Sequence, residues 1–353
     1  MAEVKPFRAL RYDERKAGPL ASLVAPPYDV ISHEERARYL TRSPYNVVHL
    51  TLADEEAAAG RLWADWQREG VLARDEEPAL WWLAQDYVGP DGVARTREGL
   101  VAAVHVEPYE RGVIRPHERT HAGPKEGRLR LLRAVRAQLE PILLLYDGDL
   151  AVAVDGPPLL EVAHGGVTNR LWRLDAEVPA QLGDASLLIA DGHHRYETTL
   201  AFDPGGSVLA AIVPTEQEGL TIFPTHRIVQ RLADTDGAVE LELEDALGRL
   251  RSRPQARAAA VLYRDGRAAL LEGDEGELDA AFVERFGPQG VTYTPDADEA
   301  VEAVDAGRAE AAFLLRPPTF EQVSAVAARG DVMPQKSTYF YPKLLSGLLF
   351  LPV

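Results

Sequence analysis

Apolar runs separated by short polar turns recur along the chain and predict buried strands that alternate with helices. The clearest case covers residues 187–213. Leu187–Ala190 predicts a strand, Asp191-Gly192 a turn, and residues 193–202 a helix. Ser207–Val213 predicts a second buried strand. This order resembles a βαβ unit, whose ligand site lies at the carboxyl end of the first strand.

The remaining pattern predicts an α+β (mixed α/β) protein in two parts. A core is expected over residues 1–232, with an insertion around 79–175, and a second α+β domain over residues 233–353. Hairpins are expected within 79–107, between 150–154 and 168–174, and within 258–272. Helices are expected at 33–40, 54–74, 124–140, 278–286, 296–306 and 319–329, and further strands at 141–147, 291–293, 311–315 and the end of 43–51.

Composition narrows the possible functions. The net charge of −17 argues against a broad nucleic-acid-binding surface, which would normally be basic. It still allows a small anionic ligand held by a few local cations. The lack of cysteine excludes disulfides, thiolate metal sites and cysteine nucleophiles. No apolar span suits a membrane helix, and the first residues lack a signal peptide's apolar core, so a cytoplasmic protein of unspecified oligomeric state is expected.

The first turn of the helix after Asp191-Gly192 would contain three potentially cationic residues, His193, His194 and Arg195. A helix normally prefers acidic residues there, because its N-terminus carries a partial positive charge. An anion docked at that end would explain the basic residues, since backbone N–H groups and an arginine together make a phosphate site. A solvated helix start is the alternative. Local rules tend to be broken at functional sites.

Two upstream segments carry groups that suit the same ligand. Pro26-Pro27 keeps the backbone extended, so Asp29 would either face a ligand or complete a turn. The second segment is the polar loop His117, Glu118, Arg119, Thr120 and His121. It suits a loop that closes over an anion, whereas a zinc site would need further ligands. The helix after it begins with Lys125, which would extend the positive field or lie on a solvated face.

Two downstream segments complete the set of candidate residues. The first consists of Thr225, His226 and Arg227, and the second of Lys336, Ser337 and Thr338. Polar groups held among aromatic residues and prolines suggest a binding surface, although a docked tail is the alternative. We expect the tail, residues 332–347, to return to a composite pocket centred on residues 187–202.

Five motifs occur in order along the chain. They are Ala25-Pro-Pro-Tyr-Asp-Val-Ile-Ser32, His117-Glu-Arg-Thr120, Ile189-Ala-Asp-Gly-His-His-Arg-Tyr-Glu-Thr198, Pro224-Thr-His-Arg227 and Met333-Pro-Gln-Lys-Ser-Thr-Tyr-Phe-Tyr-Pro-Lys343. Together they resemble the DUF1015 family of bacterial and archaeal proteins. Asp191-Gly-His-His-Arg195 is also similar to the signature of archaeal free-serine kinases in the ParB/sulfiredoxin-like superfamily.

The second resemblance implies a ParB/sulfiredoxin-like nucleotide-binding core that uses ATP or ADP with Mg²⁺. It implies that Gly192, His193, His194 and Arg195 meet the phosphates, with Asp191 near the metal or the acceptor. Sulfiredoxins use a cysteine in this box, so their activity is excluded here. ParB-type DNA binding fits poorly with the net charge.

The predicted function is a nucleotide-dependent phosphotransferase that acts on a small hydroxyl substrate, with free L-serine as one candidate. Phosphoryl transfer would use Asp29, Glu118 or Asp191 as base or metal ligand. Cations that would neutralise the transferring group are His117, Arg119, Lys125 and Lys336. A non-catalytic nucleotide-binding regulatory protein and a nucleotide phosphohydrolase remain alternatives. No P-loop or protein-kinase motif is present.

Overall fold

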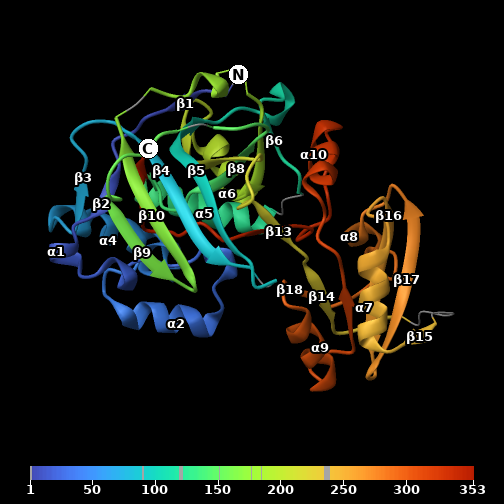
Figure 1. The fold of residues 1–353 in the computed structure, drawn as a ribbon. Helices are drawn as coiled ribbons and strands as arrows, with labels where there is room; N and C mark the ends of the chain where they lie inside the picture. The colour runs from blue at the N-terminus through green and yellow to red at the C-terminus, as the bar shows by residue number, and fades with distance from the viewer. Residues whose placement is uncertain are drawn as a thin grey trace. The chain divides into compact units, whose positions relative to one another are not determined.

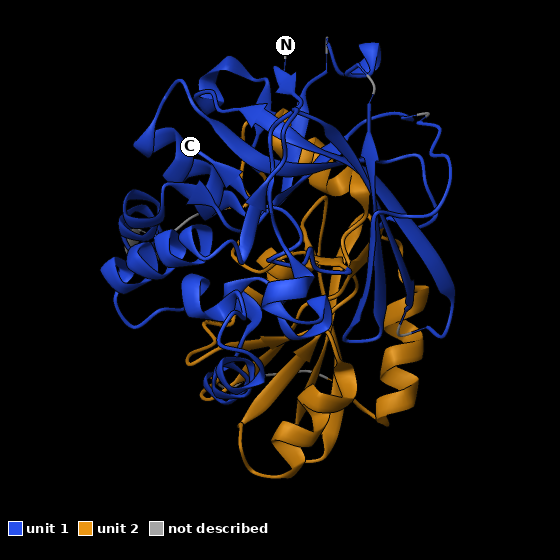
Figure 2. Ribbon diagram, turned by 90° about the vertical axis from the view of Figure 1, so that its left-hand side faces the viewer, with its two compact units in different colours: residues 1–116, 120–220, 342–353 blue, residues 117–119, 221–341 orange. Residues whose placement is uncertain are grey.

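The computed structural model describes residues 2–89, 91–118, 122–150, 152–175, 177–183, 185–233 and 239–353. The chain divides into two compact units (Figure 2). Unit 1 comprises residues 1–116, 120–220 and 342–353, and unit 2 comprises residues 117–119 and 221–341. The predicted boundary after residue 232 therefore falls inside unit 2. The mixed α+β class is confirmed, because both units combine helices with sheets.

Unit 1 is built on a nine-stranded sheet in the order β6-β11-β8-β12-β5-β4-β10-β9, with β1 paired to β5 (Figure 1). These strands are β1 (Val4–Lys5), β4 (Leu80–Val88), β5 (Ala94–His105), β6 (Ile114–Arg115), β8 (Ile142–Tyr146), β9 (Leu160–His164), β10 (Val167–Leu174), β11 (Leu187–Asp191) and β12 (Ser207–Pro214). Two small pairs join β2 (Leu10–Tyr12) to β3 (Leu72–Arg74), and β7 (Ala137–Gln138) to β21 (Leu351–Pro352). The helices are α1 (Glu14–Ala17), α2 (His33–Arg42), α3 (Val48–Thr51), α4 (Glu56–Arg68), α5 (Ala122–Val135) and α6 (His193–Phe202).

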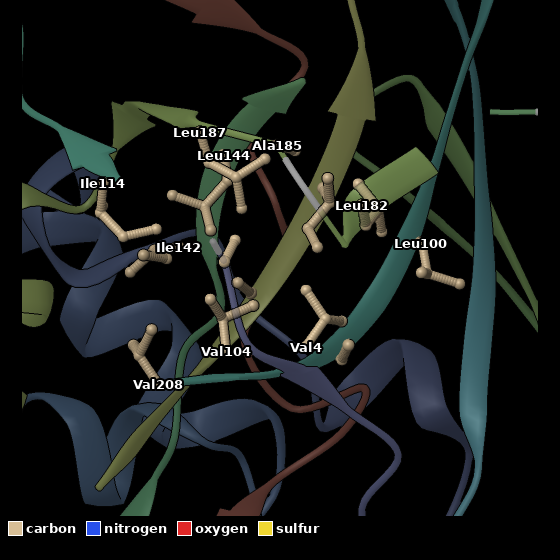
Figure 3. Close-up of a cluster of buried hydrophobic side chains, with 14 of the residues drawn as sticks. Val4, Leu100, Val104, Ile114, Ile142, Leu144, Leu182, Ala185, Leu187 and Val208 are labelled. Atoms are coloured by element: carbon tan, nitrogen blue, oxygen red, sulfur yellow. The ribbon is translucent and has the colours of Figure 1, made fainter. Parts of the chain in front are cut away.

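The core of unit 1 follows the two-residue period of its strands. Ile142 and Leu144 of β8 belong to this core, and Leu100 and Val104 of β5 pack in the same cluster (Figure 3). Alternate residues of a strand lie on one face of the sheet, so these side chains form one continuous apolar layer. Tyr196 of α6 is fully buried in this layer and attaches the helix to it.

The predicted βαβ unit over residues 187–213 is wrong. Strand β11 is antiparallel to β8, whereas β12 is parallel to β8 on its other side. Strands β11 and β12 therefore run in opposite directions and are not neighbours. The local pattern located the strand, the turn, the helix and the second strand correctly. Their directions depend on pairing with β8, which comes from another part of the chain.

Two other expectations for unit 1 also fail. Residues 43–51 end in helix α3, because the Asn46 side chain accepts a hydrogen bond from the Val48 N–H at 3.0 Å and favours a turn. The described residues of 150–154 form no strand, and β10 pairs instead with β9. The hairpin of β4 and β5 is confirmed, as is the Ser32–Glu35 capping box of α2.

Unit 2 contains a six-stranded sheet in the order β15-β17-β16-β19-β14-β18 and a separate pair, β13 and β20. Its strands are β13 (Thr221–Phe223), β14 (His226–Val229), β15 (Glu240–Leu241), β16 (Arg257–Arg264), β17 (Arg267–Glu275), β18 (Thr292–Thr294), β19 (Ala311–Leu314) and β20 (Tyr339–Tyr341). Its helices are α7 (Leu243–Ser252), α8 (Asp279–Glu284), α9 (Ala297–Asp305) and α10 (Phe320–Ala328). The hairpin predicted within 258–272 is confirmed as the pair β16 and β17, and the Thr319–Gln322 capping box of α10 is confirmed too.

The joint between β11 and α6 depends on a glycine. Gly192 has φ +94°, in the left-handed region that residues with a side chain rarely adopt. A Cβ at this position would lie 2.6 Å from Cγ2 of Ile142, a core residue of β8. Only glycine therefore allows the chain to leave the strand and enter the helix at this point.

We expect Gly192→Ala to destabilise the protein by about 2–4 kcal/mol, because the left-handed backbone and the contact with Ile142 both oppose a methyl group. Gly248→Ala in α7 is the matched control, since a Cβ there meets nothing within 4 Å. That change should stabilise the protein by about 0.5–1 kcal/mol. Urea unfolding of both variants measures the difference. Equal effects would contradict the role assigned to Gly192.

The buried His226 should make unit 2 sensitive to acid. Burial, reinforced by the charge of Arg227, lowers the pKa of His226 to about 4. Nδ1 accepts a hydrogen bond from the Leu315 N–H at 3.0 Å, so the folded imidazole must be unprotonated there. The unfolded chain binds the proton near pH 6.5. Stability should therefore fall as the pH falls from about 6.5 to about 4, by up to about 3 kcal/mol.

The measurement is urea unfolding at several pH values between 7 and 4.5, with His226→Asn as the comparison. Asparagine keeps an acceptor near the position of Nδ1 but does not titrate. The acid slope of unfolding free energy should be smaller in this variant. An unchanged slope would show that other groups cause the acid sensitivity.

Candidate functional site

The centre of the candidate site in unit 1 is the carboxylate of Asp191, the last residue of β11. Its Oδ1 accepts a hydrogen bond from Nζ of Lys343 at 2.5 Å, and its Oδ2 accepts one from Nη2 of Arg195 at 2.5 Å. All three side chains are less than one-fifth exposed. Charge-assisted bonds of this kind are strong, so the carboxylate is held in a fixed position by two cations.

Arg195 is an internal brace at the start of α6. Its Nη1 donates to the backbone carbonyl of Pro141 at 2.5 Å, in addition to the bond from Nη2 to Asp191. Burial by itself would lower the pKa of Arg195, but the charges of Asp191, Glu140 and Asp29 outweigh it and the net pKa is raised. The guanidinium is therefore a permanent cation that joins the helix to the strand end.

The structure brings the Pro-Pro-Tyr-Asp loop into the surroundings of Arg195. The Tyr28 N–H donates to Oε1 of Glu140 at 2.9 Å, and the guanidinium of Arg128 lies 3.9 Å from the centre of the Tyr28 ring. Burial raises the pKa of Tyr28 to about 12, so the phenol stays neutral. Asp29 follows on the exposed side of this turn and acts electrostatically on Arg195. That Asp29 and Arg195 serve one ligand site stays a prediction, and their electrostatic interaction is observed.

Lys125 contacts the second turn of α6. Its Nζ lies 2.5 Å from Oε2 of Glu197, and the Tyr109 hydroxyl donates to Oε1 of Glu197 at 3.4 Å. Burial and the nearby Glu197 raise the pKa of Tyr109. Lys125 is thus tied to α6 by an ion pair, and its positive charge lies beside that helix.

A second group of sequence-predicted residues comes together in unit 2. His117 Nε2 lies 2.9 Å from the Thr338 hydroxyl, and the His117 carbonyl accepts from the Met333 N–H at 2.7 Å. Arg227 Nη1 donates to the carbonyls of Thr225 and Lys336 at 2.6 and 3.0 Å. These bonds connect the tail segment to strand β14 and to the segment around His117.

The neighbouring residues of this group are also engaged within unit 2. Ser337 donates to the Pro334 carbonyl at 2.6 Å. The backbone of Glu118 forms an isolated parallel β-bridge with that of Met333, and the Glu118 carboxylate acts electrostatically on Arg227. His226 uses Nδ1 inside its own sheet. Burial lowers the pKa of Arg227.

The predicted site residues therefore divide between the units. Unit 1 holds Asp29, Lys125, Asp191, Gly192, His193, His194 and Arg195, and unit 2 holds His117, Glu118, Thr225, His226, Arg227, Lys336, Ser337 and Thr338. Arg119, Thr120 and His121 lie outside the described residues. The single composite pocket stays a prediction, whereas two clusters, one in each unit, are observed.

Sequence reasoning missed Lys343 and Glu140 as members of the cluster in unit 1. Lys343 lies within the last family motif, directly after a proline and before two leucines, and a lysine in such a setting is a signal for a buried ion pair. Glu140 is 5% exposed and accepts from the Tyr28 N–H and the Ser346 hydroxyl. It directly precedes an apolar strand, and no local pattern indicates that its partners come from both ends of the chain.

Two further observations concern metal binding and membrane-spanning helices. Within the described ranges, no three histidine, aspartate or glutamate side chains form a group that would hold a metal ion by themselves. None of the helices in the same ranges has both the length and the apolar character needed to cross a bilayer.

Several solved structures are similar to the chain. A free serine kinase in complex with AMP has a TM-score of 0.42 at 17% identity, with 65% of this chain and 84% of that chain covered. A conserved hypothetical protein from Pyrococcus furiosus has a TM-score of 0.40 at 17% identity, with 66% and 89% covered. SbnI with a C-terminal truncation, from Staphylococcus aureus, has a TM-score of 0.40 at 14% identity, with 70% and 85% covered. No curated protein matches the sequence.

A family model described as "Protein of unknown function (DUF1015)" matches residues 4–289. This range contains four of the five motifs, those at 25–32, 117–120, 189–198 and 224–227. The resemblance inferred from the motifs is therefore confirmed, and the chain belongs to the DUF1015 family.

Proposed function

We propose that this protein is a nucleotide-dependent phosphotransferase that phosphorylates the hydroxyl group of a small substrate, with L-serine as the first candidate. The observation that carries the proposal is the start of α6. Gly192, in the left-handed conformation, precedes a basic first turn, directly after the carboxylate of Asp191 at the end of a strand. A glycine entry, a helix N-terminus and adjacent cations are the parts of a phosphate site.

A comparison of two helices in unit 1 supports this assignment. Both α2 and α6 begin with a histidine. In α2, the Ser32 side chain and Glu35 form a capping box that occupies the helix start, and the first turn is acidic. In α6, Gly192 has no side chain to cap the helix, and no acidic residue lies in the first turn. The N-terminus of α6 is thus built for an external anion, whereas that of α2 is already neutralised.

The three candidate bases are ranked by their surroundings. Both oxygens of Asp191 already accept hydrogen bonds from cations, so neither is turned toward a substrate hydroxyl in preference to these partners. Glu118 belongs to the cluster in unit 2. Asp29 is exposed and belongs to the same unit as α6, so we assign it as the general base. The hydroxyl oxygen would bond to the terminal phosphorus of ATP or ADP, the bond to the bridging oxygen would break, and the proton would pass to Asp29.

Mg²⁺ fits this assignment as a companion of the nucleotide. The described residues contain no closed set of three ligand side chains, and Mg²⁺ commonly binds through one or two carboxylates, water and substrate phosphates. Because Asp29 is assigned as the base, Asp191 would supply the protein carboxylate through the remaining lone pairs of its oxygens. The ion would neutralise charge on the transferring group, and the protein's own residues would hold the nucleotide and accept the proton.

The direct test is incubation of the purified protein with ATP or ADP, Mg²⁺ and L-serine, followed by mass spectrometric detection of phosphoserine. We expect nucleotide consumption and phosphoserine in equal amounts. Asp29→Asn should lower the turnover rate by about 10²–10⁴-fold, because a general base is lost, with nucleotide affinity within about threefold of wild type. Nucleotide loss without a phosphorylated product would favour hydrolysis. Binding without turnover across a panel of small alcohols would favour a regulatory protein.

The phosphate site is tested separately by nucleotide binding. His193→Ala and His194→Ala should each weaken the affinity for ADP by about 10-fold, the value of one hydrogen bond to a charged group. His33→Ala in the first turn of α2 is the matched control, and it should leave the affinity unchanged, since that helix start is capped. Isothermal titration calorimetry measures all three. Unchanged affinity in both α6 variants would reject the phosphate site.

A further inference from the structure

Arg97 is a buried cation in unit 1 that the proposed transfer of phosphate does not use. It lies on β5, paired in register with Gln85 of β4, and only 1% of the residue is exposed. Arginine is rarely buried to this degree unless a carboxylate or another anion pairs with it. The surroundings of the guanidinium therefore decide what Arg97 does.

The side-chain hydrogen-bond partner of Arg97 is a neutral amide. Oε1 of Gln85 accepts from Nε and Nη2 of Arg97 at 3.2 and 2.5 Å. Nε2 of Gln85 donates to Oδ1 of Asn169 at 2.8 Å and to the carbonyl of Lys343 at 3.3 Å. These donor bonds fix the orientation of the amide, so its oxygen must face Arg97. Donation runs in one direction, from the guanidinium of Arg97 to Gln85 and from Gln85 to Asn169.

One N–H donor of the Arg97 guanidinium has no acceptor among the described residues. Nη1 of Arg97 is buried, and no hydrogen-bond partner for it is found there. A buried charged donor without an acceptor is costly, and such groups in folded proteins call for an explanation such as a ligand. Burial lowers the pKa of Arg97 to about 10, although Tyr87 and Asp191 oppose the shift, so the residue remains charged at neutral pH.

The nearby charges add a second argument. Asp191 is the carboxylate that acts electrostatically on Arg97, but its two oxygens already bind Lys343 and Arg195. Arg97 thus interacts with a carboxylate whose hydrogen bonds go to two other cations of unit 1. Asp191 therefore does not supply the acceptor that Nη1 lacks.

We propose that Arg97 binds an anionic oxygen group of the phosphate acceptor, a carboxylate in the first instance. A planar guanidinium suits a carboxylate or a phosphate, because its N–H groups match two oxygens. The inference rests on the proposed function in one respect, namely that the ligand at this site is the acceptor. It assigns the acceptor to the acidic small molecules and makes Arg97 a determinant of specificity.

The alternative is that Arg97 only supports Gln85 and the strands around it. The two roles differ in their effect on anion binding. In either role, an apolar replacement removes the donors to Oε1 of Gln85 and leaves a buried acceptor unsatisfied, so a loss of stability is common to both. Only a ligand-binding arginine makes the response to anions depend on its guanidinium.

The test compares Arg97→Met with Arg95→Met. Arg95 lies two residues earlier on β5 but forms an ion pair with Asp91, so it is a matched control whose charge is already compensated. Thermal unfolding is measured in sodium chloride and, at equal ionic strength, in sodium acetate, inorganic phosphate or L-serine, with ethanolamine as the analogue that lacks a carboxylate. Calorimetric titration with ADP reports on the nucleotide site independently.

We expect acetate and L-serine, but not ethanolamine, to raise the midpoint of unfolding of the wild type and of Arg95→Met. Arg97→Met should lose this response whatever its midpoint in chloride, with at least about a 10-fold weaker affinity for the carboxylate. A response to phosphate alone that is lost in the variant would assign the same residue to a phosphoryl group. If Arg97→Met does not fold, Arg97→Lys, which keeps the charge but not the planar fork, should show the same loss of affinity.

Two outcomes would overturn the proposal. One is the absence of any anion response in the wild type, which would leave only water to satisfy Nη1. The other is an equal response in Arg97→Met or Arg97→Lys and the wild type. Failure of the proposed phosphotransfer would instead appear as missing ADP binding or turnover while the response to anions at Arg97 persists.

Discussion

The ion pairs of Asp191 hold the candidate site of unit 1 together. This carboxylate ends strand β11, Arg195 begins helix α6, and Lys343 belongs to the C-terminal segment that returns to the unit. A partly buried charge is stable only when paired charges and hydrogen bonds replace its water. The requirement for two cations at one carboxylate therefore brings together three segments that are distant in sequence, and Gly192 supplies the backbone turn between two of them.

The same interaction explains the distribution of roles in the cluster. Because Asp191 and Arg195 satisfy one another, neither has its full charge available for a ligand. The parts of unit 1 that suit an external anion are the glycine entry of α6 and the buried guanidinium of Arg97. These two parts would bind an anion through different groups. The helix start uses backbone dipoles, whereas Arg97 has a side-chain network behind it that ends in an unsatisfied donor.

Local sequence patterns predicted those features that depend on neighbouring residues. The strand, turn and helix of residues 187–202, the capping boxes at Ser32 and Thr319, and the hairpin turn at Asp265-Gly266 all follow from contacts within a few residues. The antiparallel relation of β11 to β8 was not predictable in this way, because strand direction is decided by a partner elsewhere in the chain. The helix at 48–51 was missed because its valines favour a strand, whereas the Asn46 side chain accepts a hydrogen bond from the Val48 N–H at the start of this helix.

By itself, the sequence determined the α+β class, the membership of the DUF1015 family and the identity of several candidate residues, since these depend on composition, period and motif. Only the tertiary structure decided that Arg195 is a brace, that Lys343 neutralises Asp191, and that Arg97 is a buried cation opposite a neutral amide. The physical reason is that the chemistry of a charged side chain depends on its desolvation and on its partners. Both are set by segments that only folding brings into contact.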